Sequence, residues 1–149
     1  MSNISFNFGS IPIEAISIGM QISYSQTVTD SDIKNFAGLS GDHNPVHVDE
    51  IFAQKSRFGK RIAHGLMSAG YFSQLFGTKL PGPGCVYTAQ NLKFLKPVYI
   101  NDTVTATIEV ISVDIKRKRV MFRTYCTVNN IIVIDGDAEI YIPRSDFQC

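Results

Sequence analysis

The sequence predicts an α+β fold in which an antiparallel β-sheet is wrapped around a long central α-helix. Residues 64–78 form one helical pattern that is apolar on almost every side, which is typical of a buried helix. Four strand patterns follow it with no further helix between them, at residues 86–94, 103–113, 120–128 and 131–142. A buried helix followed by consecutive strands favours a sheet that packs around that helix.

Composition limits the classes of protein that this chain can belong to. A chain of 149 residues predicts a single domain covering residues 1–149, and a net charge of +1 gives no general attraction to nucleic acid or to an anionic membrane. The longest unbroken apolar run, residues 131–134, is far shorter than a membrane span, and residues 1–10 lack the pattern of a signal peptide. We therefore expect a cytoplasmic protein without nucleic-acid or membrane partners.

The three cysteines, Cys85, Cys126 and Cys149, are odd in number and widely spaced. They indicate neither a disulfide framework nor a zinc site. The three histidines do not form a metal-ligand pattern either, because His43 and His47 are separated by a proline turn. The sequence therefore predicts no bound metal.

The N-terminal third is predicted to be a lead-in at residues 1–18, a strand at 22–28 and a helix ending near residue 39. Thr29 is suited to cap that helix, because its hydroxyl can accept from a backbone N–H of the first turn. Residues 40–48 have loop chemistry, and a short helical turn is expected to begin at Asp49 or Glu50. The first helix is expected to face the core with its apolar residues Ile33, Phe36, Ala37 and Leu39.

The C-terminal half has clear boundaries between its elements. The Pro-Gly-Pro-Gly run at 81–84 ends the central helix. Asn129 and Asn130 predict a tight hairpin between the last two strands, because asparagine tolerates a positive φ. One sheet of this size has edge strands that need cover, and pairing with a second copy would supply it, so at least a dimer is expected.

The densest polar cluster in the chain lies at residues 40–47 and supplies a carboxylate and an imidazole on either side of a proline turn. The bend set by Pro45 can aim Asp42 and His47 at one point, where they can hold one water molecule and move its protons. The alternative interpretation is a loop whose polar side chains satisfy only its own backbone, with His47 packed at the surface.

A second candidate feature is the run Ala63-His64-Gly65 at the start of the central helix. Backbone N–H groups at a helix N-terminus lack partners and attract negative charge, and Gly65 lets a ligand approach closely. An oxyanion formed on a carbonyl would be stabilised there. Alternatively, Gly65 serves only close packing of the helix against the sheet, and His64 makes a hydrogen bond in the first turn.

Basic residues flank this helix and could hold the phosphates of a nucleotide-bearing substrate such as coenzyme A. For each of them, ordinary solvation of a loop or strand is the alternative. They are Arg57, Lys60, Arg61, Lys93 and Lys96.

Taken together, three strings resemble the MaoC-like (R)-specific enoyl-CoA hydratases. They are Gly-Asp-His-Asn-Pro-Val-His at 41–47, Arg-Phe-Gly at 57–59 and Ile-Ala-His-Gly-Leu-Met at 62–67. The resemblance continues through residues 80–84 and 94–98, and it covers about residues 19–142.

The resemblance implies a hotdog fold that dimerises through a sheet edge, and reversible addition of water to a trans-2-enoyl-CoA. Because a chain of this size leaves little room for a deep tunnel, we expect substrates of short to medium chain length. No cofactor is implied, since coenzyme A is part of the substrate. Asp42 would activate the water with His47 as its proton-transfer partner, and the Gly65 N–H would bind the thioester oxygen. Ser73 matches a supporting serine of the family, although it lies about 12 Å along an ideal helix from Gly65. Asn44 and His64 are expected to bind substrate with the basic residues.

Three other functions stay open from the sequence. A dehydratase acting on 3-hydroxyacyl groups of acyl carrier protein would use the same chemistry with a different partner. A hotdog thioesterase would use the same helix N-terminus but hydrolyse the thioester. A non-catalytic acyl-CoA-binding module would not need the Asp42 and His47 pair.

Overall fold

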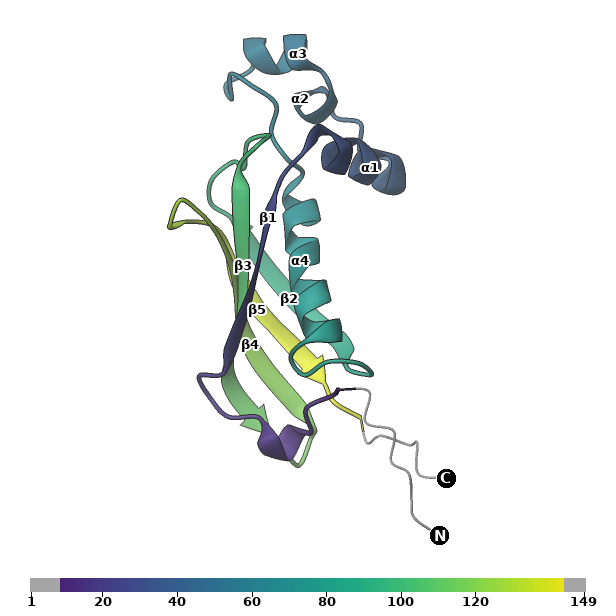
Figure 1. Ribbon diagram of the computed structural model, residues 1–149, viewed down its shortest axis with the longest axis vertical. Helices are drawn as coiled ribbons and strands as arrows, with labels where there is room; N and C mark the ends of the chain where they lie inside the picture. The colour runs from purple at the N-terminus through teal and green to yellow at the C-terminus, as the bar shows by residue number, and fades with distance from the viewer. Residues whose placement is uncertain (1–8, 144–149) are drawn as a thin grey trace.

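The computed structural model describes residues 9–143, and these form one antiparallel sheet with helices on one face and at one end (Figure 1). The sheet has the order β1-β3-β4-β5-β2. Its strands are β1 (Gln21–Thr27), β2 (Val86–Phe94), β3 (Thr103–Asp114), β4 (Arg119–Val128) and β5 (Ile131–Tyr141). The helices are η1 (Ile13–Ala15), α1 (Asp30–Ser40), α2 (Pro45–Val48), α3 (Glu50–Lys55) and α4 (Gly65–Thr78). Residues 1–8 of the predicted lead-in, and Cys149, lie outside the described residues.

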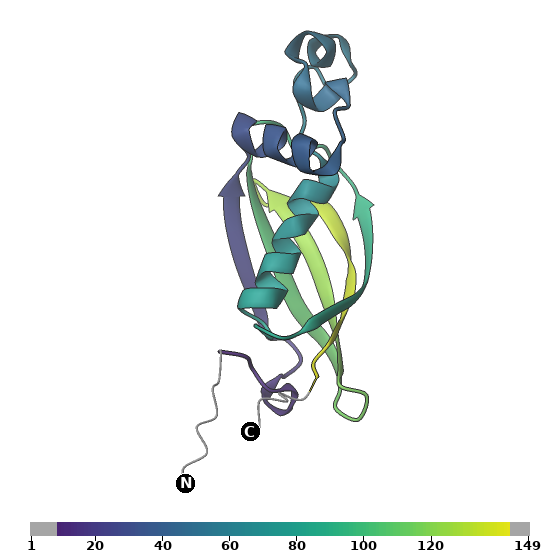
Figure 2. The ribbon, with the colours of Figure 1, turned by 90° about the vertical axis from the view of Figure 1, so that its right-hand side faces the viewer.

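Helix α4 lies along one face of the sheet and contacts all five strands (Figure 2). Phe72, Leu75 and Phe76 on α4 are almost fully buried, and the Phe76 ring meets the Phe122 ring of β4 edge to face at 4.8 Å. The inward residues of β3 are Val104, Ala106, Ile108 and Val110, as their alternation predicts. The predicted fold class is therefore confirmed.

Two burial predictions are wrong. Helix α4 is not buried on every side, because Leu66 is 65% exposed and Ser73 lies on its open face. Leu39, expected to face the core, is 86% exposed, whereas Ile33 and Ala37 of the same helix are buried. In each helix only one face packs against the rest of the fold, and the apolar residues outside that face remain open to solvent.

The hairpin between β4 and β5 turns at Asn129 and Asn130, whose φ values of 50° and 63° are positive as predicted. Strands β3, β4 and β5 form a meander, but β2 departs from the chain-order pairing that a simple meander would give. It pairs with β5 at the far edge, with Phe94 opposite Ile134. This register carries the end of β2 towards the N-terminus of α4.

Helices α1, α2 and α3 gather beyond one end of the sheet, next to the start of α4 (Figures 1 and 2). Thr29 and Asp32 form a reciprocal capping box at α1, which confirms the cap predicted for Thr29. The segment expected to be a loop at 40–48 instead contains the single-turn helix α2, which begins at Pro45 and is capped by the Asn44 side chain. Proline is favoured at a first helical position, because its φ already fits a helix.

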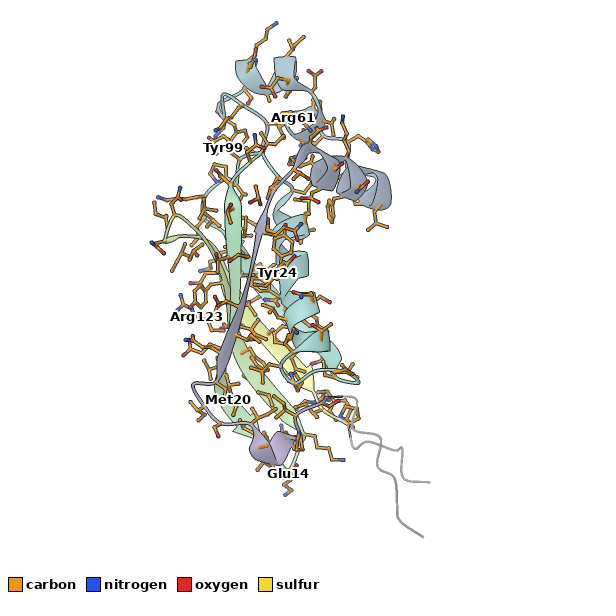
Figure 3. All side chains as sticks on the ribbon, in the orientation of Figure 1. Glu14, Met20, Tyr24, Arg61, Tyr99 and Arg123 are labelled. Atoms are coloured by element: carbon orange, nitrogen blue, oxygen red, sulfur yellow. The ribbon has the colours of Figure 1, made fainter. Side chains whose placement is uncertain are left out.

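Backbone pairing fixes the segment that leads into α4. The Ala63 N–H donates to Val98 O at 2.7 Å, and the Ile100 N–H donates to Arg61 O at 3.1 Å. Figure 3 shows Arg61 and Tyr99 together near the end of the sheet that carries α1–α3, while Glu14 and Met20 lie at the opposite end. The start of α4 is thus held between the sheet and the helical end. Among residues 9–143, no helix has the length and apolar character needed to cross a membrane.

Candidate active site

The turn at residues 42–47 brings a carboxylate and an imidazole together. The Asn44 N–H donates to Asp42 Oδ1 at 3.1 Å, which orients the carboxylate. Asp42 Oδ2 then lies 3.9 Å from His47 Nε2. This separation is too long for a direct hydrogen bond, but one water molecule can contact both atoms. The Asp42 side chain is half exposed and that of His47 is 10% exposed, so the pair lies at the edge between solvent and interior.

The tautomer of His47 follows from its partner on the main chain. Its Nδ1 lies 2.7 Å from Ile62 O, and because a carbonyl can only accept, Nδ1 carries the proton. Nε2 is therefore unprotonated, and its lone pair is directed towards Asp42. Burial lowers the pKa of His47 below its ordinary value of 6.5, and the nearby His64 and Arg61 act in the same direction, against the Ile62 carbonyl and Asp42. His47 is thus a neutral base at neutral pH.

Helix α4 begins without a side-chain cap, whereas α1, α2 and α3 are each capped by the side chain of their N-cap residue. The first N–H groups that bond within the helix are those of Met67 and Ser68, which donate to His64 O. Within residues 9–143, the N–H groups of Gly65 and Leu66 have no hydrogen-bond acceptor. Uncapped N–H groups at a helix N-terminus favour a negatively charged oxygen.

Gly65 also allows a close approach by Phe94 at the end of β2. A Cβ atom added at Gly65 would lie 2.5 Å from two atoms of the Phe94 ring. The packing interpretation of Gly65 is therefore correct in part, and it coexists with the uncapped N–H groups. Local pattern gave no role to Phe94 in the site, because only the β2–β5 register places it against α4.

A cavity of about 670 Å³ joins these groups, and its size is typical of a small-molecule site. Its polar part contains Asp42, His47 and His64, and its apolar wall includes Phe36, Phe94 and Val98. Of the predicted site residues, the cavity is lined by Asp42, His47, Arg57, His64, Gly65 and Lys96.

Other predicted site residues lie elsewhere. Ser73 is exposed on α4, and Lys93 precedes Phe94 on β2, so that strand alternation turns it to the opposite face. Lys60 places its ammonium 4.7 Å from the centre of the Tyr99 ring. Asn44 caps α2. None of these four lines the cavity.

The structure does not support Arg61 as a phosphate ligand. Its side chain is buried, and Nε donates to His47 O at 2.5 Å while Nη1 donates to Asp30 Oδ1 at 2.6 Å. Hydrogen bonds from Lys34 and Arg61 lower the pKa of Asp30, so the carboxylate stays charged as their partner. Arg61 therefore ties α2 to α1 instead of facing a ligand.

Asp42, His47 and His64 also form a group whose possible metal-ligating atoms lie within 4.8 Å of one another. The two imidazole rings are stacked, however, with centres 3.8 Å apart and planes tilted by 28°. A metal ion binds in the plane of an imidazole ring, so the lone pairs of two stacked rings point side by side and do not converge. The group fits the handling of a water molecule and its protons better than it fits a metal ion.

The structure combines an antiparallel sheet, one long helix and a cavity that holds a carboxylate–imidazole pair and an uncapped helix start. These features suit the addition of water to a polarised carbonyl compound, or its removal from one. Residues 14–131 match the family model for the MaoC-like domain. The chain belongs to the MaoC-like family.

Similar proteins agree with this assignment. The chain is 51% identical over 130 residues to an (R)-specific enoyl-CoA hydratase from Rhodospirillum rubrum, covering 87% of this chain and 90% of that protein. It is 40% identical to a 3-hydroxybutyryl-CoA dehydratase from Methylorubrum extorquens, with coverage of 89% and 85%. Among solved structures, an (R)-hydratase from A. caviae involved in PHA biosynthesis superposes with a TM-score of 0.85 at 32% identity, covering 87% of this chain and 99% of that one. The fold is the hotdog fold expected from the sequence.

Proposed function

We propose that this protein is an (R)-specific 2-enoyl-CoA hydratase, a hydro-lyase that reversibly adds water to a trans-2-enoyl thioester. The observation that carries the proposal is the 3.9 Å gap between Asp42 Oδ2 and His47 Nε2, in the same cavity as the uncapped start of α4. Hydration of an enoyl thioester needs a bound water, a proton carrier and a group that polarises the carbonyl, and this cavity offers one candidate for each.

The water would be held between Asp42 and His47. Asp42 orients the water, and neutral His47 accepts one of its protons through Nε2 as the oxygen forms a bond to C3 of the substrate. The electrons of the C2–C3 double bond move towards the thioester oxygen, giving an enolate-like state. His47 then returns the proton to C2, so that the enzyme ends the cycle in its starting protonation state.

The N-terminus of α4 would stabilise the charge that develops on the thioester oxygen. The N–H groups of Gly65 and Leu66 are oriented by the helix before substrate arrives, so little reorganisation accompanies the reaction. A single donor of this kind typically lowers the barrier by about 3 kcal/mol. No metal ion or cofactor takes part in this scheme, and their absence from the reaction stays a prediction.

Arg57 and Lys96 support a phosphate-bearing substrate, because both line the cavity together with apolar residues that suit an acyl chain. A carrier-protein thioester would use the same two cations for its phosphopantetheine phosphate. This makes a 3-hydroxyacyl-[acyl-carrier-protein] dehydratase the second candidate, and comparison of the two substrates decides between them.

A homodimer is also proposed. Leu66 is 65% exposed, and Phe94 and Leu95 are each 53% exposed, close to the cavity and to edge strand β2. A second copy paired along β2 would cover this apolar surface. A monomer at micromolar concentration in light scattering would contradict this part of the proposal. A cytoplasmic location stays a prediction.

The test follows the loss of the enoyl-thioester absorbance of crotonyl-CoA with wild-type protein and with Asp42→Asn. The variant keeps the shape of Asp42 but removes its charge, and we expect turnover to fall by roughly 10²–10⁴-fold. Coupling to stereospecific 3-hydroxyacyl-CoA dehydrogenases identifies the (R) product.

Each alternative activity has its own signature in the same assay. Release of free thiol would identify a thioesterase and refute the proposal. Binding of crotonyl-CoA and of longer enoyl-CoAs without turnover would identify a non-catalytic binding module. Consumption only of a crotonyl group carried on acyl carrier protein would favour the second candidate.

A further inference from the structure

His64 has no assigned step in the proposed reaction, yet it contacts each part of the site. It is 2% exposed, it occupies the N-cap position of α4 directly before Gly65, and its ring stacks on that of His47. Its Nε2 lies 2.9 Å from the backbone carbonyl oxygen of Asp42. One side chain therefore touches the main chain of the proposed water-orienting residue, the ring of the proposed base and the start of the carbonyl-binding helix.

We propose that His64 is a positioning residue, which holds Asp42 at its distance from His47 and from the start of α4 by donating Nε2–H to the Asp42 carbonyl. The inference rests on the proposed function for its effect on turnover, whereas the hydrogen bond itself can be observed without any reaction.

The other hydrogen bonds of Asp42 explain why such a tether matters. The Asp42 N–H donates to Ser40 Oγ, and Asp42 Oδ1 accepts from the Asn44 N–H, so both contacts lie within the same exposed turn. Within residues 9–143, the bond from His64 is the hydrogen bond of Asp42 that crosses to another part of the fold, 22 residues along the chain. Without it, the Asp42 end of the turn would lose its direct tie to the start of α4, whereas the His47 end stays bonded to Ile62 and Arg61.

The surroundings of His64 fix its tautomer. Because the Asp42 carbonyl can only accept, Nε2 carries the proton and Nδ1 is left as a buried lone pair without a hydrogen-bond partner in residues 9–143. The Phe36 ring, 4.8 Å from the His64 ring, and the His47 ring on another side restrict its rotation. A side chain held in this way is suited to fix the positions of its neighbours and not to transfer protons during the reaction.

Two substitutions separate the hydrogen bond from the ring. His64→Gln keeps an N–H near the position of Nε2 but removes the aromatic face, whereas His64→Phe keeps a ring over His47 but removes the donor. For His64→Phe we expect kcat to fall about 10–100-fold with KM changed less than about threefold, because a shift of about 1 Å in a reacting group has this effect. For His64→Gln we expect kcat within about fivefold of wild type.

The pH profile gives a second readout that a merely structural role would not move. His47 is faced by Asp42, His64 and Arg61, and its pKa is lowered mainly by burial. His64→Gln exposes the face of His47 to water and removes a neighbouring imidazole, so the acidic limb of kcat/KM should move to higher pH. His64→Phe keeps an aromatic ring over His47, and the acidic limb of its kcat/KM profile should move less. His43→Gln is the matched control, because His43 is exposed on the same turn and does not line the cavity.

Nitrogen-15 NMR of wild-type protein tests the bond without turnover or a variant. A proton on Nε2 of His64 and a bare Nδ1 are expected, and the opposite tautomer would overturn the proposal. Wild-type kcat in His64→Phe, or equal losses in both variants that follow only their folded fraction in thermal melts, would also overturn it. If wild-type protein hydrates no enoyl thioester, the proposed function fails while the NMR result still decides whether the tether exists.

Discussion

Gly65→Ala tests whether the start of α4 takes part in the reaction or serves only packing. The added Cβ would lie 2.5 Å from the Phe94 ring, and ordinary contacts begin at 3.4 Å, so the ring must move by about 0.9 Å. Phe94 is 53% exposed and can swing outward, which limits the strain to the lower part of the usual range of about 1–3 kcal/mol for overpacking. The higher helix propensity of alanine offsets up to about 1 kcal/mol of that cost. The stability of the variant should therefore change little.

Turnover should respond much more strongly than stability. The methyl group and the displaced ring would occupy the approach to the N–H groups of Gly65 and Leu66, and we expect kcat/KM for crotonyl-CoA to fall about 10²-fold. Gly70→Ala is the matched control on the same helix, since a Cβ there meets no atom within 4 Å, and it should keep wild-type turnover. Turnover of Gly65→Ala equal to that of Gly70→Ala, with both proteins folded in thermal melts, would refute the assignment of α4.

Three further predictions concern groups around the same cavity. Because burial lowers the pKa of His47, the neutral base persists below pH 6.5, and a kcat/KM profile for crotonyl-CoA should lose activity only below that value; an acidic limb above it would contradict the reasoning. Arg61→Met should lower the free energy of unfolding by about 2 kcal/mol in urea titrations, because it removes charged hydrogen bonds to Asp30 and to His47 O; an unchanged midpoint would contradict this. Lys96→Ala should raise KM for crotonyl-CoA about 3–10-fold at low salt and less at high salt, with kcat retained; a salt-independent effect would point to packing instead.

Local patterns in the sequence carry much of the fold. The alternation at 86–94 matches β2 in both bounds, and the hydroxyl of Thr29 caps α1 as its position indicates. The helix predicted at 64–78 differs from α4 by one residue, because His64 is its N-cap. Each of these features depends on residues that are neighbours in the chain, so periodicity and capping chemistry suffice to find them.

The contacts that complete the site are not of this kind. Arg61 meets Asp30 across 31 residues, and Phe94 meets Gly65 only after β2 has paired with β5. A basic residue in a loop and an aromatic residue at the end of a strand have the same local appearance whether or not such a partner exists. Sequence pattern therefore indicated Asp42, His47 and Gly65, which line one cavity, but it misplaced Arg61 and gave no role to Phe94.

The turn that carries Asp42 and His47 has a consequence for how this activity can be lost or altered. Both residues lie on one short segment that follows α1, whereas the N–H groups proposed to bind the carbonyl belong to α4, which packs on the sheet. Sequence change confined to the turn can thus abolish hydration while leaving a chain that still folds and still captures acyl thioesters. The same scaffold can in this way give rise to a carrier or sensor of these thioesters without redesign of its core.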